Sequence, residues 1–306
     1  MLKISHIEKN FESINALKDV NLKIERGEFF GLLGPNGAGK STLMNIIIGY
    51  LEPDSGKVSI DGEIISSQNI ELRKKIGYVP QEVSLYLELS AHQNLKIFGE
   101  LYGLSKKQLE MKIESVLELV QLKDRKKDAV KDYSGGMKRR LNLAASLLHD
   151  PEIVLCDEPT VGVDPQSRNA IFEMLSELNR SGKTIVYTTH YMEEAERLCS
   201  RLGIIDNGNI IADGTLVELI NLLNQKDTIK IQKTALTNNK IPALREIGVV
   251  NEYDFYFELL PKEGYNQNSK IFGKLEEIGI PNAFIQISRA TLEDVFLNLT
   301  GRSLRD

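Results

Sequence analysis

Short apolar runs alternate with amphipathic stretches over most of this 306-residue chain. The runs are bounded by polar residues and are too short for helices, so they predict strands that are buried on both faces. The amphipathic stretches between them predict helices. Strands that alternate with helices, with few hairpins, form a parallel sheet covered on both faces. The predicted strands are 28–33, 153–156, 184–188 and 202–206, and the predicted helices are 40–49, 165–181 and 191–199.

Two further regions belong to the same part of the chain. Apolar and polar residues alternate around turn residues at 2–8, 20–25 and 58–60, which predicts a small antiparallel sheet. Between 91 and 131 apolar residues recur at helical spacing, which predicts a helical insertion. We expect a helical subdomain at about 91–149 within a first domain at 1–224.

The character of the chain changes near residue 224. Alternating stretches that carry most of the nearby aromatic residues lie beside three helical patterns. These elements predict a separate, small α+β domain at 225–306. The alternating stretches are 227–232, 249–260 and 283–288, and the helical patterns are 240–247, 269–278 and 292–300.

Composition narrows the class of protein. Apolar residues make up 42% of the chain and charged residues 26%, with a net charge of −5, and this acidic balance argues against a general nucleic-acid binder. No apolar run approaches the roughly 18 residues that a membrane-spanning helix needs, and the N-terminus has no secretion signal. The two cysteines, Cys156 and Cys199, lack metal-site spacing. We expect a cytoplasmic protein without direct membrane insertion, which reaches a membrane only through another polypeptide.

A glycine-rich loop joins the strand at 28–33 to the helix at 40–49. Its spacing, Gly-x-x-x-x-Gly-Lys-Ser, fits a P-loop, in which backbone N–H groups and the helix N-terminus hold phosphates. Lys40 is expected to contact the β- and γ-phosphate oxygens, and Ser41 to bind Mg²⁺. A chance glycine turn is the alternative, against which the strand before and the helix after the loop argue. The nucleotide-binding residues predicted here are Gly34, Pro35, Asn36, Gly37, Ala38, Gly39, Lys40, Ser41 and Thr42.

An acidic pair, Asp157 and Glu158, follows the strand at 153–156. After a P-loop, such a pair predicts a nucleoside triphosphatase: Asp157 holds Mg²⁺ through water, and Glu158 polarises the attacking water. A helix cap before Pro159 is the alternative for the pair.

Two more polar side chains are placed near the carboxyl ends of strands, where ligands bind in open α/β sheets. His190 follows the strand at 184–188 and is expected to contact the γ-phosphate, although a lone histidine is usually structural. Gln81 follows Gly77-Tyr-Val-Pro80 and could bind Mg²⁺ and the water with its amide oxygen. Considered alone, Gln81 is equally consistent with an ordinary loop residue.

Taken together and in this order, the motifs resemble those of the ATP-binding subunit of ABC transporters over residues 1 to about 222. The resemblance implies a P-loop NTPase core with a mostly parallel sheet, an antiparallel β subdomain and a helical insertion, and it implies ATP and Mg²⁺ as cofactors. It also implies that Phe11 stacks on adenine, for which a phenylalanine in the core at a strand edge is the alternative. By the same resemblance the family's conserved segments are the Walker A loop at 34–42, the Q-loop glutamine Gln81, the signature at 133–137, the Walker B aspartate Asp157, the catalytic glutamate Glu158, the D-loop at 161–164 with Asp164, and the switch histidine His190.

The signature segment Tyr133-Ser-Gly-Gly-Met137 implies how two subunits combine. In the family it closes on the nucleotide of an opposite subunit, so Ser134, Gly135 and Gly136 are expected to bind ATP across a head-to-tail dimer, with the same chain as the expected partner. Tyr133 and Met137 replace the family's commonest Leu and Gln, which affects only contacts made by those side chains. The helical insertion would receive a cytoplasmic helix of an integral membrane permease. The C-terminal stretch 288–303 resembles that of prokaryotic multidrug, polysaccharide, antibiotic-resistance and sodium exporters, which implies export.

Three alternatives differ in their sequence requirements. A soluble ABC ATPase that acts on ribosomes or DNA usually has two cassettes or a long coiled coil, and neither pattern occurs in this sequence. A module that binds ATP without hydrolysing it would lack Glu158 or His190. A P-loop kinase would leave the signature and the helical insertion unexplained. We therefore expect the ATPase of an exporter, peripheral at the inner face of the cell membrane, whose transported substrate is not encoded in this chain.

Overall fold

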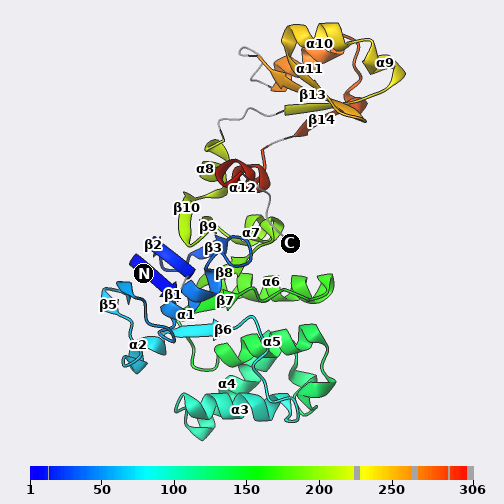
Figure 1. Ribbon diagram of the computed structural model, residues 1–306. Coiled ribbons are helices and arrows are strands. Elements are labelled where there is room, and N and C mark those ends of the chain that lie inside the picture. Colours follow the sequence, from blue (N-terminus) through cyan, green and yellow to red (C-terminus); the bar gives the residue numbers. More distant parts are fainter. Residues whose placement is uncertain (13, 224–227, 263–267, 289, 302–306) are drawn as a thin grey trace. The chain divides into compact units, whose positions relative to one another are not determined.

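The computed structural model describes residues 1–12, 14–223, 228–262, 268–288 and 290–301 (Figure 1). The chain divides into two compact units that meet between Leu216 and Val217. The sequence predicts the change of domain somewhat later, at 224/225. Within the described residues, no helix combines the length and the apolar character needed to cross a membrane.

The larger sheet of the first unit is mostly parallel. Its strand order is β10-β9-β3-β8-β7-β6, and only β10 runs antiparallel to its neighbour. The predicted α/β class with a mostly parallel sheet is confirmed, while β6 and β10 are strands that the apolar pattern did not identify. The strands are β3 (Phe29–Leu33), β6 (Ile76–Val79), β7 (Ile153–Asp157), β8 (Thr184–Thr189), β9 (Arg201–Asp206) and β10 (Asn209–Gly214).

This sheet has a hydrophobic core on each face because alternate residues of a strand point to opposite sides. In β3, Phe29 belongs to one core and Phe30 to the other. The core that contains Phe30 also contains α1 (Lys40–Ile47) and the antiparallel sheet β2-β1-β4-β5. Helix α1 is thus packed against both sheets, which holds its first turn firmly. The antiparallel strands are β1 (Leu2–Phe11), β2 (Ile14–Ile24), β4 (Ser55–Ile60) and β5 (Glu63–Ile64), and the short helix α2 (Ile70–Arg73) follows them.

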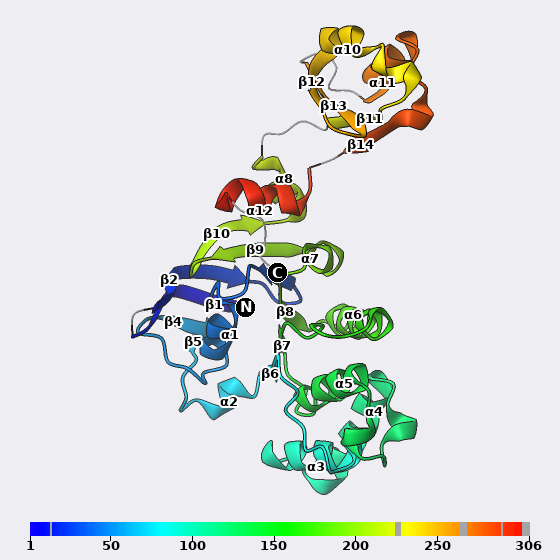
Figure 2. The ribbon, with the colours of Figure 1, turned by 45° about the vertical axis from the view of Figure 1, so that its right-hand side comes forward.

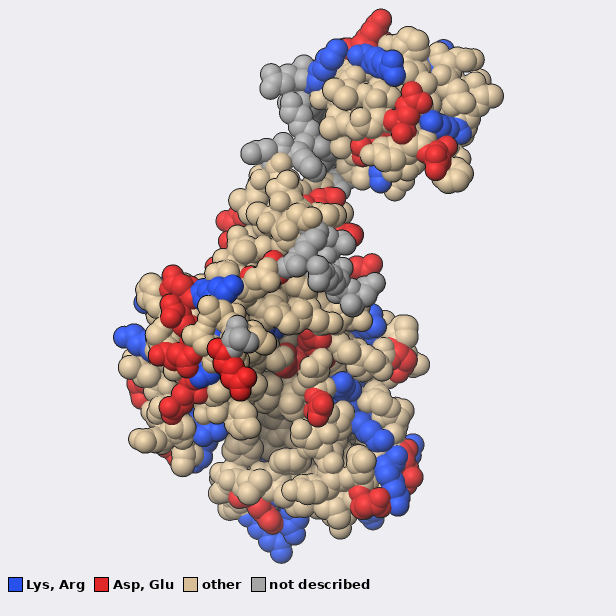
Figure 3. All heavy atoms as spheres, viewed as in Figure 1, with Lys and Arg blue, Asp and Glu red and all other residues tan. Residues whose placement is uncertain are grey.

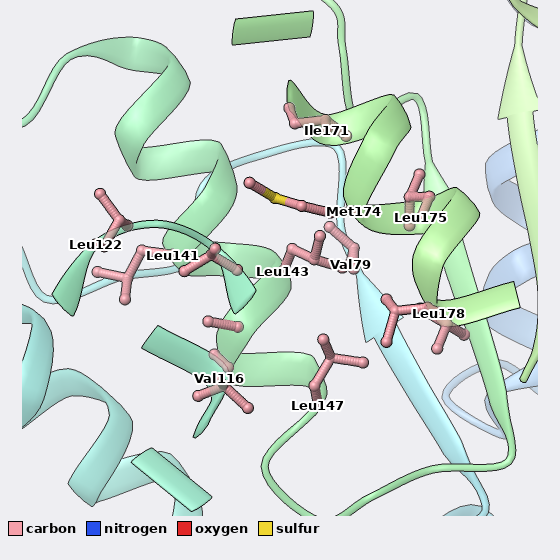
Figure 4. Close-up of a cluster of buried hydrophobic side chains, with 14 of the residues drawn as sticks. Val79, Val116, Leu122, Leu141, Leu143, Leu147, Ile171, Met174, Leu175 and Leu178 are labelled. Atoms are coloured by element: carbon pink, nitrogen blue, oxygen red, sulfur yellow. The ribbon is translucent and has the colours of Figure 1, made fainter. Parts of the chain in front are cut away.

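The core on the other face joins the sheet to the helical insertion. Figure 4 shows α5 side chains such as Leu141 and Leu143 beside α6 side chains such as Met174 and Leu178. Ser90 and Gln93 cap the start of α3 reciprocally, which explains why the first insertion helix begins there. Figures 1 and 2 show α3, α4 and α5 gathered into one subdomain. The helices are α3 (Ala91–Leu101), α4 (Lys106–Leu119), α5 (Gly135–Ser146), α6 (Pro165–Arg180) and α7 (Met192–Leu198), with short 3₁₀ turns at Lys123–Arg125 and Val130–Asp132.

The second unit contains an antiparallel sheet of order β12-β13-β11-β14. The order of elements, βαββαβ, gives a ferredoxin-like arrangement, and Leu244 of α10 and Leu275 of α11 pack with Phe257 in its core. The single alternating stretch predicted at 249–260 is a hairpin of two strands, since the chain turns back between Glu252 and Tyr256. The elements are α8 (Leu216–Asn221), β11 (Thr228–Gln232), α9 (Ala235–Asn238), α10 (Ile241–Ile247), β12 (Gly248–Glu252), β13 (Tyr256–Pro261), α11 (Asn268–Glu277), a 3₁₀ turn at Asn282–Phe284, β14 (Ile285–Ser288) and α12 (Leu292–Thr300).

Charges of both signs are interspersed on the face of the first unit that Figure 3 shows. Charged side chains of this unit are often paired: Arg26 contacts Asp61 and Glu152, and Lys9 contacts Asp54 at 2.8 Å. Exposed pairs of this kind each contribute little to stability. Neither sign predominates on that face.

Candidate functional site

The glycine-rich loop lies between the end of β3 and the start of α1. Gly37 and Gly39 have φ values of 80° and 109°, which side-chain-bearing residues rarely adopt. At Gly34 a Cβ atom would lie 2.3 Å from the carbonyl oxygen of Ile205, so only glycine fits. Gly39 precedes the first residue of α1, whose free N–H groups therefore face the loop. The loop has the backbone of a phosphate cradle.

A cavity of about 830 Å³ opens over this loop. It brings together parts of the first unit that are distant in sequence: the end of β1 and the start of β2, the glycine-rich loop, and the ends of β7 and β8. Its size and its mixture of polar and apolar walls suit a nucleotide. It is lined by Phe11, Ile14, Asn15, Ala16, Lys18, Asn36, Gly37, Gly39, Lys40, Ser41, Thr42, Gln81, Glu158, Val161, His190 and Asn207.

Lys40 and Glu158 form a buried ion pair at the floor of the cavity. Lys40 Nζ lies 2.9 Å from Glu158 Oε1, and each side chain is only 5% exposed. Lys40 Nζ also donates hydrogen bonds to the carbonyl oxygens of Gly34 at 2.7 Å and Pro35 at 3.1 Å. The lysine is therefore already positioned over the loop, with a carboxylate as its counter-ion.

Glu158 is also the point at which the other predicted catalytic side chains meet. Gln81 Nε2 donates a hydrogen bond of 3.3 Å to Glu158 Oε2, and His190 Nδ1 lies 3.2 Å from the same oxygen. Among the described residues, His190 Nδ1 is buried without a hydrogen-bond partner. Glu158 has a φ of 44°, a conformation uncommon outside glycine, and its N–H donates to Thr188 Oγ1 at 2.9 Å. The backbone here is thus constrained so that the carboxylate faces the cavity.

Asp157 lies one residue earlier and is 2% exposed. Its Oδ1 accepts a hydrogen bond of 2.7 Å from Thr188 Oγ1, and the Tyr78 hydroxyl lies 3.5 Å from its Oδ2. Burial, together with the negative charge of Asp157, raises the pKa of Tyr78 well above its usual range. Tyr78 therefore stays a protonated donor. Neither Thr188 nor Tyr78 is predicted from the sequence, where each is simply a polar residue within a buried strand.

Phe11 lies at the edge of the cavity, where β1 ends. Its side chain is 44% exposed, and Lys9 Nζ lies 5.6 Å from the centre of its ring. An aromatic ring this exposed is not a core residue. The structure therefore favours the binding alternative for Phe11 over the packing alternative.

The signature segment lies at the start of α5. Ser134 caps this helix by accepting a hydrogen bond of 3.2 Å from the Met137 N–H, and the Tyr133 ring is buried behind it. Gly135 has open space around its Cα, whereas a Cβ at Gly136 would collide with Ser167 of α6. Among the described residues that line the cavity, none comes from the signature. The helix terminus is exposed, away from the loop of its own chain.

Asp164 lies nearby as the cap of α6. Its Oδ1 accepts a hydrogen bond of 2.9 Å from the Ser167 N–H. This backbone hydrogen bond lowers the pKa of the Asp164 carboxyl group. Asp164 does not line the cavity either, so its predicted contact with nucleotide would also involve a second subunit.

A phosphate-binding loop between a buried strand and a helix, with an acidic pair at the end of a strand of the same sheet, defines a P-loop nucleotide hydrolase. The comparisons with known proteins narrow this class. The sequence profile of the ABC transporter family matches residues 17–161. The chain is 40% identical to the linearmycin resistance ATP-binding protein LnrL of Bacillus subtilis (strain 168), over the full length of both.

A second relative and a solved structure agree with the match to the ABC transporter family. The chain is 38% identical to the Nod factor export ATP-binding protein I of Cupriavidus pinatubonensis, over all of this chain and 92% of the relative. A dimeric ATP-binding cassette, solved in a post-hydrolysis state with ADP and Pi, matches with a TM-score of 0.63 and 30% identity over 71% of this chain and 99% of that one. The chain belongs to the ABC transporter family and is one of its ATP-hydrolysing, ATP-binding subunits. The predicted family, fold class and ATPase activity are confirmed.

Proposed function

We propose that this chain binds ATP and Mg²⁺ in the 830 Å³ cavity, closes head to tail on a second ATPase subunit, and powers export through a separate membrane permease. The observation that supports this most directly is the convergence of Lys40, Gln81 and His190 on Glu158 at the floor of the cavity. That cluster combines a cation for phosphate, a carboxylate for water and a buried ring nitrogen that has no hydrogen-bond partner among the described residues.

Binding of ATP would rearrange the Lys40–Glu158 pair. The γ-phosphate offers Lys40 a stronger counter-ion than the single carboxylate that now lies 2.9 Å away. Once Lys40 contacts phosphate, Glu158 is free to accept a hydrogen bond from water. His190 Nδ1, 3.2 Å from Glu158 Oε2, is placed to contact the γ-phosphate oxygens. In this account the triphosphate itself releases the catalytic carboxylate.

Three oxygen-bearing side chains would hold the magnesium ion: Ser41, Asp157 and, through its amide oxygen, Gln81. Among the described residues no group of three or more His, Cys, Asp or Glu side chains could hold a metal by itself. That agrees with Mg²⁺, which binds through few protein ligands and the phosphates of its nucleotide. The ion would neutralise negative charge that develops on the phosphates during transfer. Phe11, exposed at the cavity edge, would stack on the adenine ring.

The second subunit supplies what the cavity of one chain lacks. Ser134 and Gly135 lie at an exposed helix start, with free space around Gly135, and an opposite P-loop nucleotide would fit there. The start of α5, a helix of 12 residues, adds its positive end to this surface. The relative solved with ADP and Pi is dimeric. We infer a head-to-tail dimer of identical chains, with Asp164 at the same interface.

A second cavity, of about 450 Å³, is the proposed docking site for the permease. It lies between the sheet core and the helical subdomain, and Ile70, Phe98 and Leu101 give it an apolar wall. Leu101 is 78% exposed and Ile70 is 62% exposed, so together they give this wall an exposed apolar patch of the kind that marks protein–protein contacts. We propose that a cytoplasmic helix of the permease binds here, which would locate the chain at the inner face of the membrane. The relatives named for resistance and for Nod factor export favour export as the direction.

This docking site yields a prediction. We expect Leu101→Asp to release the chain from the membrane fraction of its source cells while its ATPase activity in solution stays unchanged, because a buried carboxylate would be unpaired in the interface. The matched control is Met111→Asp, since Met111 is 66% exposed on α4 and does not line this cavity. Membrane sedimentation followed by detection of the chain is the measurement. If Leu101→Asp stays in the membrane fraction as fully as Met111→Asp, this docking site is contradicted. A wild-type chain that sediments with ribosomes instead of membranes would favour the soluble alternative.

A further inference from the structure

Glu194 is a buried carboxylate outside the cavity, in the first turn of α7, and only 3% exposed. It accepts three hydrogen bonds from hydroxyl groups. Thr160 Oγ1 donates to its Oε1 at 2.8 Å, while the Tyr187 hydroxyl at 2.9 Å and Thr189 Oγ1 at 2.8 Å donate to its Oε2. Burying a carboxylate is costly, and here three donors offset that cost. So many donors on one acidic side chain fix its position closely.

One of these hydroxyl groups fixes the backbone on both sides of His190. Thr189 directly precedes His190, and its Oγ1 also accepts a hydrogen bond of 2.9 Å from the Tyr191 N–H. Because the Thr189 O–H group donates its hydrogen bond to Glu194, the oxygen lone pairs of Thr189 are left to accept from the Tyr191 N–H. The contact Glu194–Thr189–Tyr191 therefore spans His190 with two hydrogen bonds in series.

The segment that carries His190 and Tyr191 also makes ring contacts and a contact with the guanidinium group of Arg168. The rings of His190 and Tyr191 lie 4.1 Å apart, and the Arg168 guanidinium lies 5.5 Å from the centre of the Tyr191 ring. Arg168 Nε also lies 3.7 Å from Glu194 Oε1. The negative charge of Glu194 thus has a cation from α6 beside it, and the Tyr191 ring contacts both that cation and the His190 ring.

The segment after Glu158 is tied to the same carboxylate. Thr160 follows Glu158 by two positions, and its Oγ1 lies 3.0 Å from the Tyr187 hydroxyl as well as contacting Glu194. Burial raises the pKa of Tyr187, and the charge of Glu194 raises it further, so this hydroxyl remains protonated and able to donate. Glu194 therefore links the segments that carry both Glu158 and His190.

We propose that Glu194 is a positioning residue for ATP hydrolysis, which holds His190 against the γ-phosphate through Thr189 and Tyr191. This proposal rests on the catalytic role of His190 proposed above. Without the carboxylate, the Thr189 hydroxyl loses its acceptor and the His190 backbone gains freedom. Misplacement of a reacting group by about 1 Å can lower a rate about 100-fold, so a residue that touches no substrate can still control turnover.

The test compares three variants of the full-length chain. We expect Glu194→Ala to lower kcat about 10- to 100-fold with KM for ATP nearly unchanged. Glu194→Gln should retain most of the wild-type turnover, because its amide oxygen can accept from Tyr187 and Thr189 while its NH₂ group donates to Thr160. Glu193→Ala, at the exposed neighbouring position, is the control and should match wild type. A parallel loss of kcat and melting temperature, with no rescue by glutamine, would indicate a merely structural role and overturn the proposal.

The decisive comparison uses a His190→Ala background under single-turnover conditions. If Glu194 acts through His190, adding Glu194→Ala there should change the rate less than about twofold, because the two effects are not independent. An undiminished loss in that background would contradict the proposal even though His190 remains essential. If His190→Ala itself leaves turnover unchanged, the proposed function of the site fails instead. Should Glu194→Ala not fold, Thr189→Val removes the two hydrogen bonds that link Glu194 to Tyr191, with little change of volume, and the same comparison applies.

Discussion

Replacing Glu158 by glutamine is expected to lower ATP turnover about 100- to 10,000-fold, while ATP still binds. Among the described residues that line the cavity, Glu158 has the only carboxylate that can polarise water, and an amide cannot take up a proton at neutral pH. Glutamine has the same shape, so the hydrogen bond between the residue 158 N–H and Thr188 should persist. Single-turnover hydrolysis and equilibrium ATP binding, measured on the same preparation, separate the chemical step from affinity.

The same variant should bind ATP more tightly than wild type. In the wild-type chain ATP competes with Glu158 for Lys40, whose Nζ lies 2.9 Å from the carboxylate. Glutamine removes that competitor and leaves Lys40 without its counter-ion until phosphate arrives. Glu173→Gln, an exposed position on α6, is the matched control and should change neither quantity. Wild-type turnover in Glu158→Gln would exclude Glu158 as the catalytic carboxylate.

Lys40→Ala should abolish both ATP binding and hydrolysis. Loss of one preorganised donor to a developing negative charge typically costs about 100- to 1,000-fold in rate, and here the lysine also contributes to binding. The change has a second effect, since it removes the lysine cation that pairs with the buried Glu158 carboxylate, and breaking a buried ion pair in this way costs about 3–5 kcal/mol. Loss of activity in Lys40→Ala would therefore not by itself distinguish an inactive site from an unstable protein.

A double variant separates these two effects. Lys40→Ala combined with Glu158→Gln removes both charges, so the thermal stability should recover while ATP binding stays lost. Tight ATP binding by this stable double variant would contradict the role of Lys40.

Phe11→Ala offers a contrast within the same cavity. It should raise KM for ATP by the equivalent of about 1–3 kcal/mol and leave kcat unchanged, because base stacking contributes equally before and during reaction.

Much of the site was predictable because its chemistry lies in short segments. The glycine spacing and Lys40 are local in sequence, and an acidic pair after a buried strand can be recognised without knowledge of the fold. Since the carboxyl ends of parallel strands meet at one edge of the sheet, Glu158 and His190 were expected to lie close together. The 3.2 Å separation of their polar atoms agrees with that expectation.

Contacts that depend on strand register were not predictable. Thr188 reaches Asp157 because the two residues are paired across β7 and β8, and the sequence alone does not specify that pairing. Likewise the sequence does not distinguish Glu194 from Glu193 beside it. Only the packing of α7 against β8 shows that Glu194 is buried while Glu193 is exposed. The missed strand β10 has only half-buried apolar residues at the edge of its sheet, so its apolar pattern is weak.

We propose that each ATP site is shared between two copies of this chain. The most direct test mixes Lys40→Ala chains with Ser134→Asp chains, each inactive alone, and measures ATPase activity. Aspartate keeps the cap of α5 but places a negative charge against the phosphates of the opposite subunit. In a mixed dimer, Lys40 of one chain faces Ser134 of the other, so one intact site forms and the mixture should regain activity in proportion to the mixed dimers. A mixture no more active than the sum of its two parents would contradict the shared site.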